Sequence, residues 1–267
     1  MNDRPEVTGA PLVRRDVEAG VARLTLDSPH NRNALSTALV TQLVEGLDAA
    51  LADAAVRVIV LTGAGPVFCS GADLKEQREY RQRGEAPPVA DLLVAALTRL
   101  LGSPKPVVAR INGHARAGGL GLIGASDIAI APEDATFGFA EVRIGVVPAV
   151  ISVTTVPRLT PRASLELFLT GETFDGRRAV EVGLLNRAVP AAALDAEVDR
   201  YVDMLRRGGP EALSHIKPMV ARVRALAPAE AFREMAELST SRFASDEGQE
   251  GIRAFAERRD PSWVEAG

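Results

Sequence analysis

The sequence lacks several features that would place it in a specialised class of protein. It has one cysteine, Cys69, among 267 residues, so no internal disulfide can form and a reducing compartment is expected. Aromatic residues make up only 4%, which argues against a surface that stacks nucleic-acid bases. No apolar run approaches the roughly 20 residues that span a bilayer, and Met1 to Arg15 has no apolar segment typical of a signal peptide. We therefore expect a cytoplasmic protein without nucleic-acid or membrane partners.

Strong charge and the signatures of metal or hydrolase sites are also missing. The net charge of −4 provides no general attraction for nucleic acids or anionic membranes. His30, His114 and His215 do not have metal-ligand spacing, so we expect no metal site. The G-x-S-x-G segment of an α/β serine hydrolase is absent. Catalysis, if present, must depend on other groups.

Short apolar strands and amphipathic helices alternate through the first two thirds of the chain. Val56 to Thr62 is rich in β-branched residues and predicts a buried strand, Pro106 to Ile111 predicts another buried strand, and Val21 to Leu26 predicts a strand of a hairpin. Ser36 is a favourable N-cap, and leucines follow it every four residues, as in an amphipathic helix. After Pro190 only helical segments follow. The sequence predicts an α/β protein with two parts, residues 1–190 and a helical region at 191–267.

The segment from Phe68 to Lys75 predicts a strand, a tight turn at Gly71 and a helix capped by Asp73. In that arrangement the backbone N–H of Ala72 is free to donate outward. A strand-to-helix connection that binds no ligand is an equally good interpretation of this segment alone.

The glycine pair Gly118–Gly119 predicts a second turn that leads into a helix. Such pairs are common in α/β proteins and carry little weight by themselves. Two outward N–H donors from separate turns form an oxyanion hole, in which the loss of one donor raises a reaction barrier by on the order of 3 kcal/mol.

Glu141 is a carboxylate in apolar surroundings, between Phe137-Gly138-Phe139 and Ile144. One interpretation is a structural carboxylate that forms an ion pair with Arg143. The other is an acid/base group whose pKa is raised by desolvation.

Together these segments resemble the enoyl-CoA hydratase/isomerase (crotonase) superfamily, from about Val13 to Trp263. The matching segments are Asn33-Ala34-Leu35, Leu61-Thr62-Gly63, Phe68 to Lys75, Asn112-Gly113 through Gly119, Asp127-Ile128, Phe137-Gly138, Glu141, Gly145 to Pro148, Leu169-Thr170-Gly171, Ala179, Gly183-Leu184, Glu247 to Gly251 and Phe255 to Arg259. The resemblance implies a crotonase-like spiral of ββα units, with a C-terminal helical region that forms homotrimers or hexamers.

The resemblance also implies an acyl-CoA substrate and no cofactor beyond its CoA moiety. The N–H groups of Ala72 and Gly118 would bind the thioester oxygen, and Glu141 would be the acid/base. Residues implied in CoA binding are Arg32, Ala34, Ser70, Ala72, Asp73, Leu74, Lys75, Gly118, Phe255 and Arg258. Phe255 and Arg258 match positions that reach a neighbouring subunit's nucleotide in relatives, although Lys is more usual than Arg at the second.

Gly121 is the main departure from the family pattern. Many hydratases of the family carry a first glutamate there and a second at the position of Glu141. Water addition needs a base for the water and an acid for Cα, and one glutamate can perform both steps in sequence. A single glutamate is also what the family's Δ3,Δ2-enoyl-CoA isomerases use.

The favoured hypothesis is an enoyl-CoA hydratase that acts on a 2-enoyl-CoA. The segment from Glu141 to Ser152 is similar to hydratases of branched or methylglutaconyl-type acyl-CoA that also lack the first glutamate. The other hypotheses are a Δ3,Δ2-enoyl-CoA isomerase and a low-activity acyl-CoA-binding paralogue. Arg116 either pairs with a second carboxylate on the acyl group or is solvated. His114 is expected to bond to backbone, and Cys69 to be a small packed residue.

Overall fold

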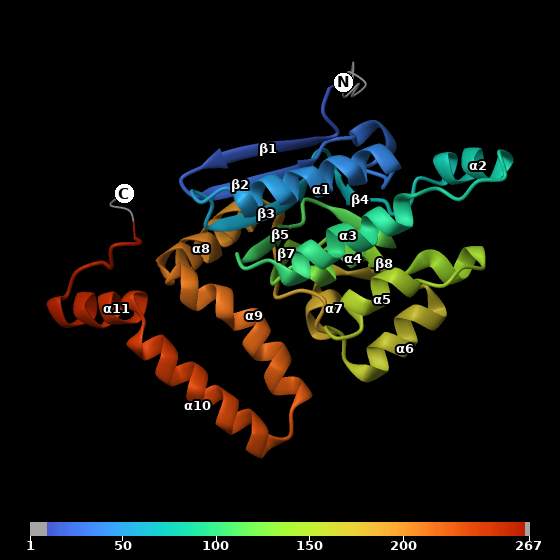
Figure 1. Ribbon diagram of the computed structural model, residues 1–267. Helices are drawn as coiled ribbons and strands as arrows, with labels where there is room; N and C mark the ends of the chain where they lie inside the picture. Colours follow the sequence, from blue (N-terminus) through green and yellow to red (C-terminus); the bar gives the residue numbers. More distant parts are fainter. Residues whose placement is uncertain (1–9, 265–267) are drawn as a thin grey trace, which may run out of the picture.

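The computed structural model describes residues 10–264, which form two β-sheets covered by helices (Figure 1). The larger sheet has the order β1-β2-β3-β5-β7-β10, and the smaller one has the order β4-β6-β8-β9. The strands are β1 (Val13–Glu18), β2 (Val21–Leu26), β3 (Val58–Gly63), β4 (Val67–Cys69), β5 (Val107–Arg110), β6 (His114–Arg116), β7 (Ile128–Pro132), β8 (Thr136–Gly138), β9 (Phe174–Asp175) and β10 (Arg187–Val189).

The helix starts predicted at Ser36 and Asp73 are confirmed. Ser36 caps α1, because its side chain accepts a hydrogen bond from the N–H of Leu39, and Asp73 caps α2 in the same way. The helices are α1 (Thr37–Ala52), α2 (Leu74–Gln82), α3 (Val89–Gly102), α4 (Gly118–Ala125), α5 (Ala149–Thr155), α6 (Pro161–Thr170), α7 (Gly176–Glu181), α8 (Leu194–Arg207), α9 (Pro210–Ala225), α10 (Pro228–Ala244) and α11 (Asp246–Glu257), with short 3₁₀ turns at η1 (Pro29–Asn31), η2 (Ala140–Ile144) and η3 (Ala191–Ala193).

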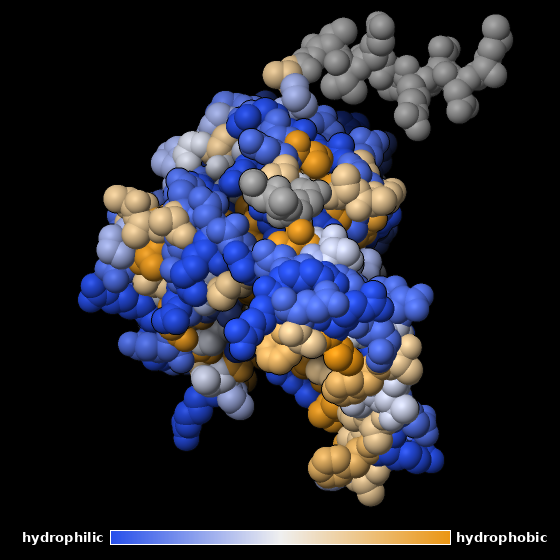
Figure 2. Space-filling view, turned by 90° about the vertical axis from the view of Figure 1, so that its left-hand side faces the viewer, coloured by the Kyte–Doolittle hydropathy of each residue, from blue (hydrophilic) through white to orange (hydrophobic). Residues whose placement is uncertain are grey.

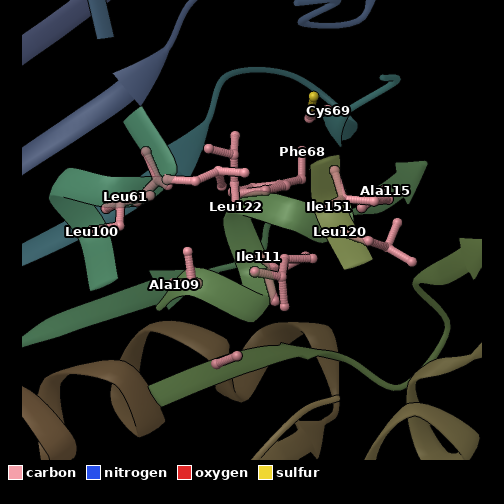
Figure 3. Packing of buried hydrophobic residues seen from close by; sticks show 14 of the residues in the cluster. Leu61, Phe68, Cys69, Leu100, Ala109, Ile111, Ala115, Leu120, Leu122 and Ile151 are labelled. Carbon is pink, nitrogen blue, oxygen red and sulfur yellow. The ribbon is translucent and has the colours of Figure 1, made fainter. Parts of the chain in front are cut away.

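The larger sheet is buried on both faces. In β3, Ile59 and Leu61 point into one hydrophobic cluster with α1, α3 and α4, and Val58 and Val60 point into a second cluster with α8. This alternation explains why the segment reads as a continuous apolar run, since each face of the strand meets helices. Figure 3 shows the first cluster, in which Leu61, Leu100 and Leu122 come from three separate elements. β3 pairs in parallel with β2 and β5.

The smaller sheet positions the residues that the sequence predicts to form the site. Strands β4, β6 and β8 are parallel neighbours, with Cys69 opposite Ala115 and Ala115 opposite Phe137. β6 and β8 were not predicted as separate strands, because three residues are too few to show the alternation that identifies a strand. The carboxyl ends of the three strands lie at one edge of this sheet.

The last helices are much more exposed than the rest of the fold. None of the residues of α9 is buried, and in α10 only Ala231 is. Figure 2 shows orange apolar side chains gathered on the lowest arm of the molecule, at the height of the α9–α10 turn in Figure 1. The division of the chain into two parts at residue 190 stays a prediction. Helix α8, which follows this position, packs on the larger sheet in one cluster with β3, β5 and β7. Over residues 10–264, none of the helices has the length and hydropathy needed to cross a bilayer.

Candidate active site

Three segments predicted to be functional begin where three adjacent parallel strands end. Ser70-Gly71-Ala72 follows β4, Ala117-Gly118 follows β6, and the turn that carries Glu141 follows β8. Because the carboxyl ends of parallel strands share one edge of a sheet, residues about 70 positions apart in sequence are brought together. The sequence-predicted donors and carboxylate therefore share one side of the molecule.

The N–H of Ala72 is left free by a short bridge to Leu35. The N–H of Leu35 donates to the oxygen of Gly71 at 2.7 Å, and the N–H of Asp73 donates to the oxygen of Leu35 at 3.4 Å. In a parallel bridge of this kind the central residue directs its own N–H and C=O to the other side. Within residues 10–264, the N–H of Ala72 donates to no protein group, as an oxyanion donor requires.

The N–H of Gly118 is free for a different reason. Gly118 is the first residue of α4, and the first N–H groups of a helix have no intrahelical acceptor. The turn before it is sharp, because Ala117 has φ +47° and ψ −118°, a region that residues other than glycine rarely adopt. This backbone directs the start of α4 out of β6, and the positive end of the helix dipole lies at the same place.

The two turns are in direct contact. A Cβ placed on Gly71 would lie 2.8 Å from the Cβ of Ala117, so only glycine fits at residue 71. A Cβ on Gly118 would lie 2.5 Å from the Cδ1 of Leu35, the residue that bridges to Ala72. The packing around residues 71 and 118 thus leaves no room for a side chain at either position.

Asn33 and Asn112 hold the loop that leads into β4. The buried Asn33 accepts a hydrogen bond from the N–H of Ser28 and donates to the oxygens of Ala64 and Val67. Asn112 accepts from the N–H of Gly63 and donates to the oxygen of Gly65. The sequence resemblance identified both segments, but the role of the two amides follows only from these bonds.

Glu141 lies in the 3₁₀ turn η2 and is partly buried. Its Oε2 atom is enclosed and has no hydrogen-bond partner among the described residues. Desolvation raises the pKa of Glu141, as predicted. An enclosed carboxyl oxygen without a partner is a costly arrangement for stability and a suitable one for proton transfer.

The alternative of a Glu141–Arg143 ion pair is wrong. The Nε of Arg143 donates instead to the oxygen of Gly171 at 2.9 Å, at the end of α6. No Lys, Arg or His side chain within residues 10–264 forms an ion pair with Glu141. Arg143 therefore fastens the turn while Glu141 stays unpaired.

The place beside Gly121 is filled by α5. A Cβ on Gly121 would lie 2.5 Å from the Cγ2 of Ile151, whose side chain is 3% exposed. The sequence indicated that a carboxylate is absent here, but it did not show what takes its place. Ile151 was not among the predicted site residues.

The side chains of Arg116 and His114 form hydrogen bonds with the backbone of Thr136 in β8. The guanidinium of Arg116 donates to the oxygens of Ala115 and Thr136 and to the Oγ1 of Thr136. Thr136 opens β8 whereas Glu141 follows its end, so Arg116 turns away from the carboxylate. His114 accepts from the N–H of Thr136 at 3.0 Å, which confirms its expected bond to backbone. Cys69 is fully buried, and its burial raises the thiol pKa to about 12, as for a packed residue.

The residues expected near CoA form two separate groups. Ser70 joins the first to the loop at Arg32, because its N–H donates to the oxygen of Arg32 and its hydroxyl to that of Asn31. Arg32 is exposed and forms no ion pair with a carboxylate of the described chain, whereas Ala34 is buried beside it. The other members are Asp73, Leu74 and Lys75 at the start of α2.

Phe255 and Arg258 form the second group, at the end of α11. Phe255 is 88% exposed, and Arg258 ends the helix in the left-handed conformation. Figure 1 shows α11 and α2 at opposite ends of the molecule, so one chain does not bring the two groups together.

Two free N–H donors and a partly buried carboxylate thus follow adjacent strands of an α/β fold. The chain belongs to the enoyl-CoA hydratase/isomerase family, whose model matches residues 16–266. Enoyl-CoA hydratase EchA19 of Mycobacterium tuberculosis is 32% identical over 247 residues, which cover 90% of this chain and 91% of that protein. Two solved structures superimpose with a TM-score of 0.87: AtuE of Pseudomonas aeruginosa (32% identity, 95% of this chain and 100% of that one) and an enoyl-CoA hydratase of Shewanella pealeana (29%, 94% and 96%).

Proposed function

We propose that this protein is an enoyl-CoA hydratase that adds water across the double bond of a 2-enoyl-CoA. The observation that carries the proposal is that the free N–H groups of Ala72 and Gly118 and the unpaired carboxylate of Glu141 follow three adjacent parallel strands. The unpaired Arg32 beside Ser70 supports binding of the CoA phosphates.

In the proposed reaction, the two N–H groups donate to the thioester oxygen and draw electron density away from the β-carbon. Glu141 takes a proton from water as the water oxygen bonds to that carbon, and negative charge develops on the thioester oxygen. The protonated Glu141 then returns the proton to the α-carbon, which restores the thioester carbonyl. The raised pKa of Glu141 suits a group that must both accept and release a proton. The chemistry uses only the acyl-CoA, water and these groups.

A Δ3,Δ2-enoyl-CoA isomerase is the second candidate, and the apolar filling beside Gly121 favours it. Isomerisation needs one carboxylate to move one proton between two carbons and needs no water, so Ile151 is no obstacle. A paralogue that binds acyl-CoA with little turnover is the remaining candidate.

Incubation with crotonyl-CoA and, separately, with a 3-enoyl-CoA distinguishes the three. Loss of enoyl absorbance with crotonyl-CoA and formation of 3-hydroxyacyl-CoA supports the hydratase. Formation of conjugated enoyl-CoA from the 3-enoyl-CoA, without hydration of crotonyl-CoA, would contradict the hydratase and support the isomerase. Binding without either product supports the paralogue.

We further propose that the chain forms a homotrimer or a hexamer, so that Phe255 and Arg258 of one subunit reach the CoA of its neighbour. The separation of α11 from α2 and the exposed apolar side chains of α9 to α11 support this assembly.

A further inference from the structure

Helix α5 packs directly on the backbone of α4. A Cβ on Gly121 would lie 2.5 Å from the Cγ2 of Ile151, and one on Gly124 would lie 2.7 Å from the oxygen of Thr154. The Oγ1 of Thr154 also donates to the oxygen of Gly121 at 3.0 Å. Gly121 and Gly124 are three residues apart on one face of α4, as are Ile151 and Thr154 on α5. Any side chain at residue 121 must therefore displace Ile151.

This contact lies next to the Gly118 donor and is joined to Glu141 by a short segment of chain. Gly121 is three residues after the Gly118 donor and so shares its side of α4. On the other partner, Ile151 follows Glu141 by ten residues, and the N–H of Val146 donates back to the oxygen of Glu141 at 3.1 Å. Figure 3 shows Ile151 in the same cluster as Leu120 and Ala115, the residues that flank the oxyanion turn.

Resting on the proposed function, we propose that Ile151 is a specificity-determining residue that forms an apolar wall of the acyl pocket beside the reacting carbons. Its side chain occupies the position to which a side chain at residue 121 would project, and it carries no polar atom. The Ile151 side chain offers no hydrogen-bond partner to a carboxylate or hydroxyl on the acyl chain. Burial of such a polar group without a partner is unfavourable. The branched methyls of Ile151 also limit the room for substituents on the β-carbon. The preferred substrates are therefore acyl-CoAs with small, unbranched, apolar acyl groups, in contrast to the branched or methylglutaconyl-type acyl groups that the sequence resemblance suggested.

The test compares a linear and a branched substrate in Ile151→Ala and Ile151→Val. We expect the ratio of kcat/KM for 3-methylcrotonyl-CoA to that for crotonyl-CoA to rise about tenfold in I151A, since pocket methylenes change discrimination by factors of about 10 to 200. The I151V protein, which loses one methyl, should show a smaller rise in the same direction. Leu43→Ala in α1 is the matched control, because Leu43 is as buried as Ile151 but lies in a different helix. It should lower the melting temperature and leave the ratio unchanged.

Binding of saturated acyl-CoAs by calorimetry tests the proposal without turnover. If the wild-type protein neither hydrates nor isomerises, the proposed function fails, but I151A should still shift binding from butyryl-CoA towards 3-methylbutyryl-CoA. An unchanged preference in both the kinetic and the calorimetric measurements, with a melting temperature lowered as in L43A, would show Ile151 to be an ordinary core residue and overturn the inference.

A double-mutant cycle tests the geometry independently. Gly121→Ala should lower the melting temperature, because its Cβ meets Ile151. The decrease in the double variant G121A/I151A should be smaller than the sum of the decreases in the two single variants. Additive effects would show that residue 121 does not project onto Ile151 and would remove the basis of the proposal.

Discussion

The candidate site and the C-terminal helices differ in how completely one chain determines their structure. At the strand ends, buried amides and backbone bonds fix each group, and the fully buried Asn33 makes three hydrogen bonds. In α9 to α11, large side chains such as Phe232 and Phe255 face outward with little contact. The site donors and carboxylate are thus arranged by intrachain contacts, whereas the last helices expose surface that a second chain can bury.

Lys217 is one of the polar links between the C-terminal helices and the body of the fold. It extends from α9 to the body, where its Nζ forms an ion pair with Asp127 at 2.7 Å and donates to the oxygens of Leu100 and Lys105. Burial lowers the pKa of Lys217, although Asp127 opposes that shift. We therefore expect substitutions at the strand ends to have large effects on activity or stability and substitution of Lys217 to have a moderate effect on stability. Substitutions on the outer face of the C-terminal helices should change the stability of the single chain little.

The largest expected effect follows from Glu141→Gln. Loss of the Glu141 carboxylate should reduce kcat by on the order of 10³, because a positioned acid/base typically contributes 10²- to 10⁴-fold. Acyl-CoA binding by calorimetry should be unchanged. Steady-state kinetics on crotonyl-CoA and on a 3-enoyl-CoA provide the measurement, and retention of most activity on the better substrate would remove Glu141 from the mechanism.

The pH profile provides a second test of the same carboxylate. The base is active when ionised, and burial raises its pKa, so activity should fall on acidification at a pH above the ordinary glutamate value of 4.5. The acid limb of kcat/KM in the wild-type protein measures this pKa. An acid limb at or below 4.5 would contradict the desolvated environment of Glu141.

Asn33→Ala should have the next largest effect and act through stability. It removes three hydrogen bonds at a fully buried position and leaves the N–H of Ser28 and two carbonyls without partners, which we expect to cost about 3 kcal/mol. Urea denaturation measures the change. Asn186→Ala is the matched control, since exposed Asn186 makes one bond, to the N–H of Ala129, and should lose less than about 1 kcal/mol. Equal losses would contradict the special role of the Asn33 amide.

Much of this arrangement could be predicted from local sequence. Ser36 and Asp73 identified helix starts, the apolar run in β3 identified a strand covered on both faces, and Glu141 stood out as a carboxylate among apolar residues. These signals are local, because caps, periodicity and composition act over a few residues.

The rest depends on contacts between distant segments. Sequence spacing does not reveal that Arg143 turns to Gly171 rather than to Glu141, because that choice is made by the packing of η2 against the end of α6. Likewise, Gly121 indicated a missing side chain, but its replacement by Ile151 follows from the approach of α5 to α4 across 30 residues of chain. Resemblance to a family supplied the pairing of Ala72 with Gly118, which no local pattern contains.

A moderate effect is expected for Lys217→Met, which keeps the length of the side chain and removes its charge. The variant leaves Asp127 without its cation, and we expect a loss of about 2 kcal/mol, below the value for a fully buried pair because both partners are partly exposed. Hydrogen exchange should show faster opening of α9 than of α4. Arg222→Met is the control, because it removes an exposed pair with Glu234 and should cost less than about 1 kcal/mol. Uniform destabilisation of both regions would show that α9 is not separately anchored.

The smallest effect on the folded chain is expected on the outer face of α9, where Ile216, Val220 and Val223 follow one another at helical spacing and are all exposed. Replacing all three with Gln removes apolar surface that water already reaches, so each isolated chain should change by less than about 0.5 kcal/mol. The same change should lower the mass measured by light scattering if this face joins subunits, and should make the melting temperature less dependent on protein concentration. Val17→Gln on β1 is the control for loss of an exposed apolar residue elsewhere. A wild-type protein that is monomeric at every concentration would show that the exposed helices serve another purpose, whereas a triple variant that keeps its assembly would direct attention to Phe232 and Phe243 on α10.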